Sequence, residues 1–555
     1  MRKLLKVAVL GLATAVAAIG LVACGGGSSS SSGGGGGGKE GGEINGTLTS
    51  FPDYLDPQLS YTLEGWEGLW NVYVPLLTYQ HGNGEETTKP VPGLAESMPK
   101  ISPDGKTYTL TLRKGMKYSD GTPIKASDFP YAIQRLFKTD SGGAPFFENI
   151  VGAEDYANGK ADTISGIQAN DQTGQITIQL NDPSGTFVNE LGLMFAAPVP
   201  QSTPLDKDQT NTPPPSSGPF MITNVDAPNS YTLERNPQFK TVQAAGASDV
   251  PDAHVDKITV TQNKNQSAQA TGIEQNTNDF MVDPPPADLL PDIENTYADR
   301  FRFQESINTY YFWMNMTKPP FDNLQVRQAV NYAIDPAALN RIFGGRLHPD
   351  QQILPPGMPG YTDYEDLYPG PDLTKAKQLL AAAHPSDMDI TVWTDDEPDR
   401  KRIGAYYQDV LNQLGFHTTL KIIGGDVYFT TIGNLKTPDL DTGFADWFQD
   451  YPHPNDFFEP LLSGDSIHPT NNNNYSQTNI PDLTAKINEL DTKQLGDSGV
   501  EDQYGALDKS FMEQAAWAPY GNERFTTFTS DRVNFDGVDF SLLFNLDYSS
   551  FQLKG

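Results

Sequence analysis

Between about residues 44 and 121, short segments of alternating apolar and polar residues, separated by turns, dominate the chain. The clearest is YTLTL at residues 108–112, in which every second side chain is apolar, and this period predicts a strand with one buried face. The preceding SPDG at residues 102–105 is typical of a type I turn. A helix is then predicted to begin with Ser127 as its N-cap, because Pro130 in the first turn needs no N–H partner there, and to continue through Phe137.

The second half of the chain has the longer period of alternating strands and helices. Asp322 and Gln325 form a candidate capping pair, and the apolar residues that follow them, up to Ile334, fall on one helical face. Asp335 and Pro336 are expected to end that helix and to cap the next one.

A complete βαβ unit is predicted further on. Residues 390–394 have the pattern of a strand, residues 400–414 that of a helix with Gly415 as its C′ residue, and residues 416–423 that of a second strand. A strand, a helix and a strand within about thirty residues are expected to form a right-handed unit with parallel strands. The chain therefore contains α/β architecture in its second half.

The N-terminus has the pattern of a secretory lipoprotein signal. Three cations, at positions 2, 3 and 6, precede an apolar run over residues 7–23 that ends in LVA directly before Cys24. This arrangement resembles the bacterial lipobox, so residues 1–23 are predicted to be a signal peptide and Cys24 the lipidated mature N-terminus. The alternative is a transmembrane anchor in which Cys24 is incidental. The expected location is the outer face of the cytoplasmic membrane.

A Gly/Ser-rich segment follows the cysteine. Residues 25–42 lack any apolar side chain, which predicts a flexible tether over residues 24–43 with a reach of roughly 20 to 25 Å. Cys24 is the only cysteine in 555 residues. The exported part is therefore expected to contain neither an intramolecular disulfide nor a cysteine-based metal site, and its stability must come from core burial.

The charge balance excludes one class of partner. The formal charge is −32, and removal of the three signal cations leaves 35 Lys and Arg against 70 Asp and Glu, or −35. Because nucleic-acid binding needs a basic surface, no nucleic-acid partner is expected. The acidity is interpreted as a contribution to solubility rather than as attraction for cationic ligands.

The order of short motifs along the chain resembles the family 5 extracellular solute-binding proteins, which include oligopeptide- and dipeptide-binding proteins of ABC importers. The most specific stretch is SPDGKTY at residues 102–108, followed by LRKG at 112–115 and SDGTP at 119–123. Further motifs in the same order are YLDP at 54–57, PGLAES at 92–97, SGPF at 217–220, ERNP at 234–237 and VRQAV at 326–330. The resemblance covers nearly the whole mature chain.

The resemblance implies a periplasmic-binding-protein-like α/β fold, with two lobes around a ligand cleft and an additional third domain. The first lobe is expected to comprise residues 44–76, 216–308 and 526–555, the additional domain residues 77–215 and the second lobe residues 309–525. Connections between the lobes are expected near residues 308–315 and 517–528. The first of these is apolar on both faces, as a buried connecting strand would be.

Candidate ligand residues come from FADWFQDYP at residues 444–452, which resembles the family's cleft motif, a Trp followed three residues later by an Asp. In peptide-binding members that Asp pairs with the α-ammonium group of the ligand, which places the role on Asp450 with Trp447 beside the bound chain. A carboxylate about 3 to 4 Å from an ammonium group gains roughly 4 kcal/mol at an effective dielectric near 20, before desolvation is subtracted. In the same register, Tyr61 and Leu63 are expected near the ligand on the opposite lobe.

Structural interpretations of these residues stay open. Asp450 could cap a turn and Trp447 could belong to the core, while Asp456 is interpreted as a helix N-cap. His453 stands where many family members have an acidic residue, and it is interpreted as a turn residue or as a neighbour of the contact residues. No arginine has a spacing that marks it as the partner of a peptide carboxylate, so ligand length is left open.

The function predicted is capture of a small solute, expected to be a peptide, by a monomer that delivers it to ABC permease subunits. An oligosaccharide, a nickel chelate, or a sensor or scaffold role would use the same fold. An exported hydrolase has only GDSG at residues 496–499 in its favour, without a recognisable histidine and aspartate for a catalytic triad. The seven histidines show no metal-ligand spacing, so no enzyme activity, cofactor or metal is expected.

Overall fold

The computed structural model describes residues 38–364 and 367–555. The predicted signal peptide, Cys24 and the tether up to residue 37 lie outside the described residues. The last part of the predicted tether is structured, because β1 (Gly38–Lys39) pairs antiparallel with β23 (Leu553–Lys554) near the C-terminus. The pair is held by backbone hydrogen bonds, which do not depend on apolar side chains. The composition of this segment therefore gave no sign of the strand. Over the described ranges, no helix has the length and apolar character needed to cross a membrane.

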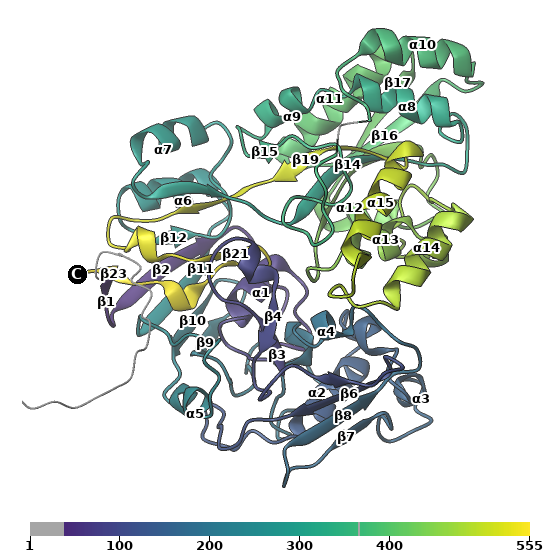
Figure 1. Ribbon diagram of the computed structural model, residues 1–555. Coiled ribbons are helices and arrows are strands. Elements are labelled where there is room, and N and C mark those ends of the chain that lie inside the picture. Colours follow the sequence, from purple (N-terminus) through teal and green to yellow (C-terminus); the bar gives the residue numbers. More distant parts are fainter. Residues whose placement is uncertain (1–37, 365–366) are drawn as a thin grey trace, which may run out of the picture. The chain divides into compact units, whose positions relative to one another are not determined.

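A five-stranded mixed sheet brings the start of the chain beside its middle (Figure 1). Its strands, in spatial order, are β12 (Phe280–Met281), β2 (Glu43–Leu48), β11 (Lys257–Gln262), β10 (Ser230–Arg235) and β9 (Phe220–Asp226). Strand β2 runs parallel to both β11 and β12, whereas β10 is antiparallel to its neighbours. The parallel pairs need long crossover connections, which the chain between residues 48 and 257 provides.

A separate four-stranded antiparallel sheet lies within residues 100–179. It consists of β5 (Lys100–Ile101), β6 (Thr107–Thr111), β8 (Gln175–Gln179) and β7 (Ile167–Ala169). Tyr108 and Leu110 of β6 are buried, which confirms the alternation predicted for this strand. The hydrophobic side chains of this region form one continuous core with those around the five-stranded sheet.

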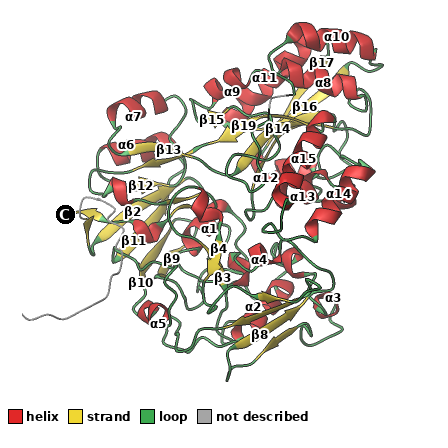
Figure 2. Cartoon of the chain, in the orientation of Figure 1, coloured by secondary structure: helices red, strands yellow, loops and turns green. Residues whose placement is uncertain are grey.

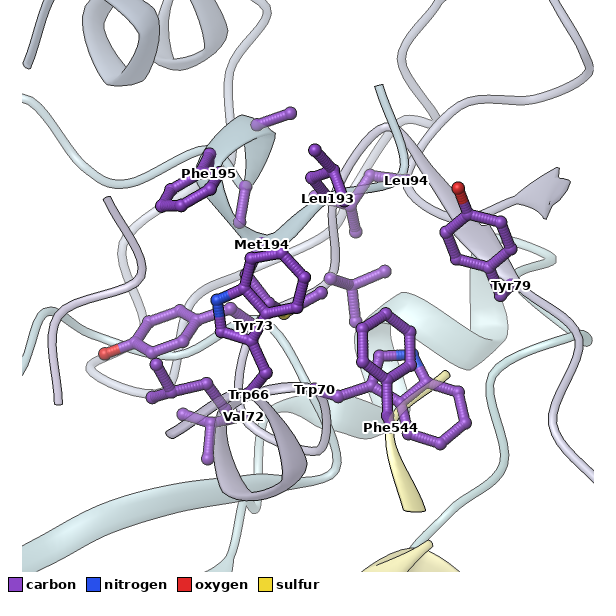
Figure 3. Packing of buried hydrophobic residues seen from close by; sticks show 14 of the residues in the cluster. Trp66, Trp70, Val72, Tyr73, Tyr79, Leu94, Leu193, Met194, Phe195 and Phe544 are labelled. Carbon is purple, nitrogen blue, oxygen red and sulfur yellow. The ribbon is translucent and has the colours of Figure 1, made fainter. Parts of the chain in front are cut away.

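Aromatic packing joins distant parts of the chain in this first core (Figure 3). Trp70 of α1 (Leu63–Leu69 and its C-cap) lies against Phe544 near the C-terminus, with ring centroids 4.8 Å apart. Trp66 of the same helix contacts Phe195 edge-on at 5.5 Å. Each such contact removes large apolar areas from water, so α1 is held in place by Phe544 on one side and by Phe195 on the other.

The six-stranded sheet carries a second core and is flanked by helices (Figure 2). Its strand order is β15 (Leu347–His348), β19 (Trp517–Glu523), β14 (Asn308–Met314), β18 (Thr442–Phe448), β16 (Asp389–Asp395) and β17 (His417–Ile423). Every residue of β14 is buried, as the apolar pattern predicts. Strands β16 and β17 are parallel and are joined by α11 (Pro398–Leu414), which confirms the βαβ unit, with Gly415 left-handed at its C-cap.

One helix start corrects an expectation, and two others confirm the predicted N-cap residues. Helix α8 (Leu324–Ala333) is capped by Asn323, whose side chain accepts from the N–H of Gln325, and Asp322 is not its cap. Ser127 does precede α2 (Asp128–Lys138), but its hydroxyl donates to Asp171 and makes no capping bond. Asp335 caps α9 (Pro336–Ile342) as predicted. Neighbouring polar side chains can each bond to the first N–H groups of a helix, and contacts with the rest of the protein decide which of them does so.

The remaining elements connect or cover these sheets. The helices are α3 (Ala153–Ala157), α4 (Phe187–Glu190), α5 (Phe239–Ala244), α6 (Gln266–Glu274), α7 (Leu290–Thr296), α10 (Leu373–Ala383), α12 (Gly425–Ile432), α13 (Asn455–Leu462), α14 (Pro481–Asp491) and α15 (Val500–Glu513). Short antiparallel pairs are β3 (Leu77–Tyr79) with β4 (Pro90–Pro92), β13 (Phe301–Gln304) with β20 (Phe525–Phe528), and β21 (Phe540–Ser541) with β22 (Asn545–Leu546).

Candidate functional site

Strand β18 brings the Trp-x-x-Asp motif to the end of the six-stranded sheet. Trp447 pairs with Thr309 of β14 one residue before β18 ends, and Asp450 follows in the turn that leads into α13. Both side chains are partly exposed. The strand therefore fixes the backbone of the motif while leaving its two candidate ligand residues accessible.

A small polar loop positions Tyr61 directly before α1. The carboxylate of Asp53 accepts hydrogen bonds from the Ser60 hydroxyl at 2.9 Å, the Tyr61 N–H at 2.8 Å and the Thr62 hydroxyl at 3.1 Å. The Tyr61 ring stacks on Trp66 with centroids 5.7 Å apart, yet the residue is 40% exposed. Backbone and ring are thus held while the phenol oxygen projects outward.

Tyr61 and Asp450 meet across 389 residues of sequence. The Tyr61 hydroxyl donates to Oδ2 of Asp450 at 2.9 Å. Asp456 supports this contact from α13, because its Oδ2 accepts from the Asp450 N–H at 3.0 Å and from the indole N–H of Trp447 at 3.2 Å. The interpretation of Asp456 as an N-cap is therefore wrong: the residue lies inside the first turn of α13, whose N-cap is Pro454, and it bonds backward to the motif.

Burial perturbs the protonation of these groups. Desolvation raises the pKa of Asp450, and the hydrogen bond from Tyr61 opposes that shift. The pKa of Asp456 is raised well above its usual range, by desolvation and then by repulsion from Asp450. Desolvation and the adjacent Asp450 also raise the pKa of the Tyr61 phenol. Desolvation therefore raises the pKa of both carboxyl groups of this pair, and their mutual repulsion adds to the shift at Asp456.

Tyr61, Trp447, Asp450 and Asp456 line one cavity of about 910 Å³. This volume lies within the range of small-ligand sites. Aromatic rings of Phe146 and Tyr451 form part of its wall. Further carboxyl groups line it as well, namely Asp182, Glu190, Glu459 and Asp491. Sequence reasoning missed these four, because they are spread over 310 positions and share no motif.

Leu63 is placed elsewhere. It lines a second cavity, of about 670 Å³, together with Arg346 and Arg400, and it is not among the residues that line the cavity of Asp450. Both arginines already have carboxylate partners: Arg346 pairs with Glu523 at 2.9 Å and Arg400 with Asp446 at 2.8 Å. Of the four predicted contact residues, the structure thus brings three together.

His453 is a buried turn residue. Its Nδ1 accepts from the N–H of Asn455 at 3.1 Å, and its ring packs edge-on against Tyr504. Desolvation lowers its pKa to about 3, so the ring is neutral at physiological pH. It is not among the cavity-lining residues.

The GDSG sequence does not line the cavity of Asp450. Ser498 of the GDSG sequence lies in an exposed turn before α15. In the part of the chain that the structure describes, no three His, Cys, Asp or Glu side chains are grouped as a metal site would require.

Comparison with known proteins gives consistent matches. The family model "Bacterial extracellular solute-binding proteins, family 5 Middle" matches residues 89–468. Dipeptide-binding protein DppE of Bacillus subtilis is 26% identical over 80% of this chain and 80% of its own length. Heme-binding protein A of Haemophilus influenzae is also 26% identical, over 81% of each chain.

Solved structures share the fold. The structure of "Clavulanic acid biosynthesis oligopeptide binding protein 2" superposes with a TM-score of 0.85 at 25% identity, covering 94% of this chain and 97% of that one. A periplasmic binding protein DppA from Helicobacter pylori, in complex with peptide STSA, has a TM-score of 0.73 at 21% identity, with 93% and 99% coverage.

Proposed function

Because the chain belongs to the family 5 bacterial extracellular solute-binding proteins, we propose that it captures a peptide by its free α-ammonium group and delivers it to the permease of an ABC importer. Asp450 is the counter-ion of the ammonium group, Tyr61 orients that carboxylate, and Trp447 lies beside the bound backbone. The protein acts by binding and carries out no catalysis. It works as a monomer at the outer face of the membrane, anchored through Cys24.

The observation that carries this proposal is the Tyr61–Asp450 contact at the wall of the 910 Å³ cavity. The hydroxyl satisfies only one of the two carboxylate oxygens, and no Lys, Arg or His pairs with Asp450 within residues 38–364 and 367–555. A partly buried carboxylate without a counter-ion loses part of its hydration, so an ammonium group in the cavity would relieve that cost.

Relatives with peptide-binding names support the peptide over other solutes. They include the dipeptide-binding protein DppE and the oligopeptide-binding protein OppA, both of Bacillus subtilis. Names in the same set also include a heme-binding protein and a glutathione-binding protein. Membership of the family alone therefore leaves the ligand open, and Asp450 is the residue that favours a ligand with an ammonium group.

The experiment compares Asp450→Asn with wild type by calorimetry, using a peptide that binds wild type and its N-acetylated form. The substitution keeps shape and removes charge. Loss of a charge pair in a dry cavity costs about 2 to 5 kcal/mol, or roughly thirty- to several-thousand-fold in affinity. The acetylated peptide is expected to bind wild type poorly and to lose little more in the variant, because both changes delete the same interaction.

Two results would contradict the proposal. Additive losses in this cycle would show that Asp450 does not hold the ammonium group. Native mass spectrometry of wild type that finds a co-purified ligand without an amine, and no binding of peptides, would replace the peptide by another solute class.

A further inference from the structure

The cavity that contains Asp450 is acidic on several sides. Besides Asp450 and Asp456, its lining includes Glu190 from α4, Glu459 from α13, Asp491 from the end of α14, and Asp182. No Lys, Arg or His is among the lining residues. The second cavity differs, since its lining includes Lys264, Arg346, Arg400 and Arg402 beside its carboxylates.

The carboxyl groups of Glu190 and Asp491 have neutral partners only. Glu190 is 8% exposed and accepts from the Thr186 hydroxyl at 2.7 Å, while Asp491 accepts from the amide of Asn455 at 2.8 Å. Neither forms a salt bridge with any of the described residues. Desolvation, with added repulsion from Asp491, raises the pKa of Glu190 to about 8; desolvation, with added repulsion from Glu459, raises that of Asp491 to about 6.

Asn455 provides a second, independent indication of a ligand. It is 3% exposed and lines the same cavity. A carboxylate accepts hydrogen bonds and cannot donate them, so the amide nitrogen of Asn455 must face Asp491, which leaves Oδ1 for another donor. That oxygen is buried and has no hydrogen-bond partner among the described residues. A buried orphan acceptor is costly, and a ligand N–H would satisfy it.

We infer that this wall, formed by Glu190, Asp491 and the Oδ1 of Asn455, receives a second cationic group of the ligand, so that the protein selects peptides with a lysine or arginine side chain. The inference rests on the proposed function, in which Asp450 holds the α-ammonium group. A guanidinium group suits the wall well, because its five N–H donors match the several acceptor atoms of two carboxyl groups and an amide oxygen. The remaining two carboxylates contribute less, since Glu459 is exposed and Asp182 pairs with Lys106 at 3.4 Å.

The test uses arginine and citrulline, which have nearly the same shape but differ in charge. Three tripeptides carry arginine at the first, second or third position with alanine elsewhere, and each has a citrulline counterpart; trialanine is the reference. Binding to the full-length chain is measured by calorimetry. At least one arginine peptide is expected to bind at least about tenfold more tightly than its counterpart, as a charge-assisted hydrogen bond would produce.

Variants locate the effect. Asp491→Asn is expected to bring the ratio of the affinities for the arginine peptide and its citrulline counterpart close to one. Glu190→Gln is expected to lower the same ratio and serves as the test if Asp491→Asn fails to fold. Asp482→Asn is the matched control, since Asp482 is exposed on the same helix and does not line the cavity, and it is expected to leave the ratio unchanged.

The outcomes separate the two proposals. Equal affinity of all three arginine peptides and their citrulline counterparts, with trialanine bound, overturns the selectivity and leaves peptide capture intact. A wild-type ratio that persists in both Asp491→Asn and Glu190→Gln overturns the assignment to this wall. Failure of every tripeptide to bind removes peptide capture itself, and the inference with it.

Discussion

Asp56 and Asp450 are both acidic side chains in protein surroundings, but their charges are compensated in different ways. Asp56 is fully buried, and its two oxygens accept from both terminal nitrogens of Arg135, at 2.7 and 3.0 Å. The N–H groups of Gln58 and Gln209 complete its shell. Asp450 has the Tyr61 hydroxyl at 2.9 Å and no cation within the described chain.

The difference distinguishes a charge that is compensated within the fold from one that is not. The Asp56–Arg135 pair links the loop before α1 to α2 with every charge satisfied, so adding a ligand there would gain nothing. The carboxyl groups around Asp450 lack such compensation, and their raised pKa values report that cost. Uncompensated buried charge beside a cavity is therefore the better indicator of function.

The largest expected effect comes from breaking the compensated site. Arg135→Met leaves Asp56 buried without its counter-ion and is expected to lower the free energy of unfolding by about 3 to 5 kcal/mol, measured by chemical denaturation. Lys89→Met is the control, because the Lys89–Glu86 pair is exposed and worth about 1 kcal/mol or less. A loss for Arg135→Met as small as that of the control would mean that the buried pair is not needed by the fold.

A smaller, pH-dependent effect is expected at Glu190. Its pKa is about 8 in the folded protein and about 4.3 when unfolded, so both states hold the proton below pH 4. As the pH rises toward 8, the unfolded state loses the proton first, which lowers the stability of the folded state. Glu190→Gln removes this penalty, and its advantage over wild type is expected to grow by on the order of 3 kcal/mol between pH 5 and pH 8.

Melting curves of both proteins across this range would measure that change. Glu294→Gln, an exposed position on α7, is the matched control and is expected to show no such trend. If the stability difference between Glu190→Gln and wild type does not vary with pH, Glu190 is ionised in the folded protein. Its carboxyl group would then be compensated, as that of Asp56 is by Arg135.

The smallest effect is expected from Tyr61→Phe, which removes the single hydrogen bond to Asp450 and keeps the ring. A loss of about 0.5 to 1.5 kcal/mol in the binding free energy of a peptide is expected, or about two- to tenfold in affinity. Calorimetry with one peptide measures it, and Tyr54→Phe serves as the exposed control. A loss larger than that caused by Asp450→Asn would show that Tyr61, rather than the carboxylate, dominates ligand binding.

Much of the architecture could be predicted from local patterns. The alternation in β6 and the βαβ unit of β16, α11 and β17 were predictable because a period of two or of 3.6 residues records which face is buried. The order of family motifs led to the correct fold class. The tether end and the cap of α8 were predicted wrongly, since backbone pairing with the C-terminus and the choice between adjacent capping side chains leave no periodic signal.

The site divides in the same way. The motif around Trp447 and Asp450 is local, so it could be predicted from its resemblance to the family's cleft motif, and Tyr61 was predicted in the same register. Only the tertiary structure shows that Asp456 bonds back to the motif and that Leu63 lines a different cavity. The acidic wall of Glu190 and Asp491 is likewise invisible in sequence, because charges 301 positions apart interact only after folding has brought them together and excluded water between them.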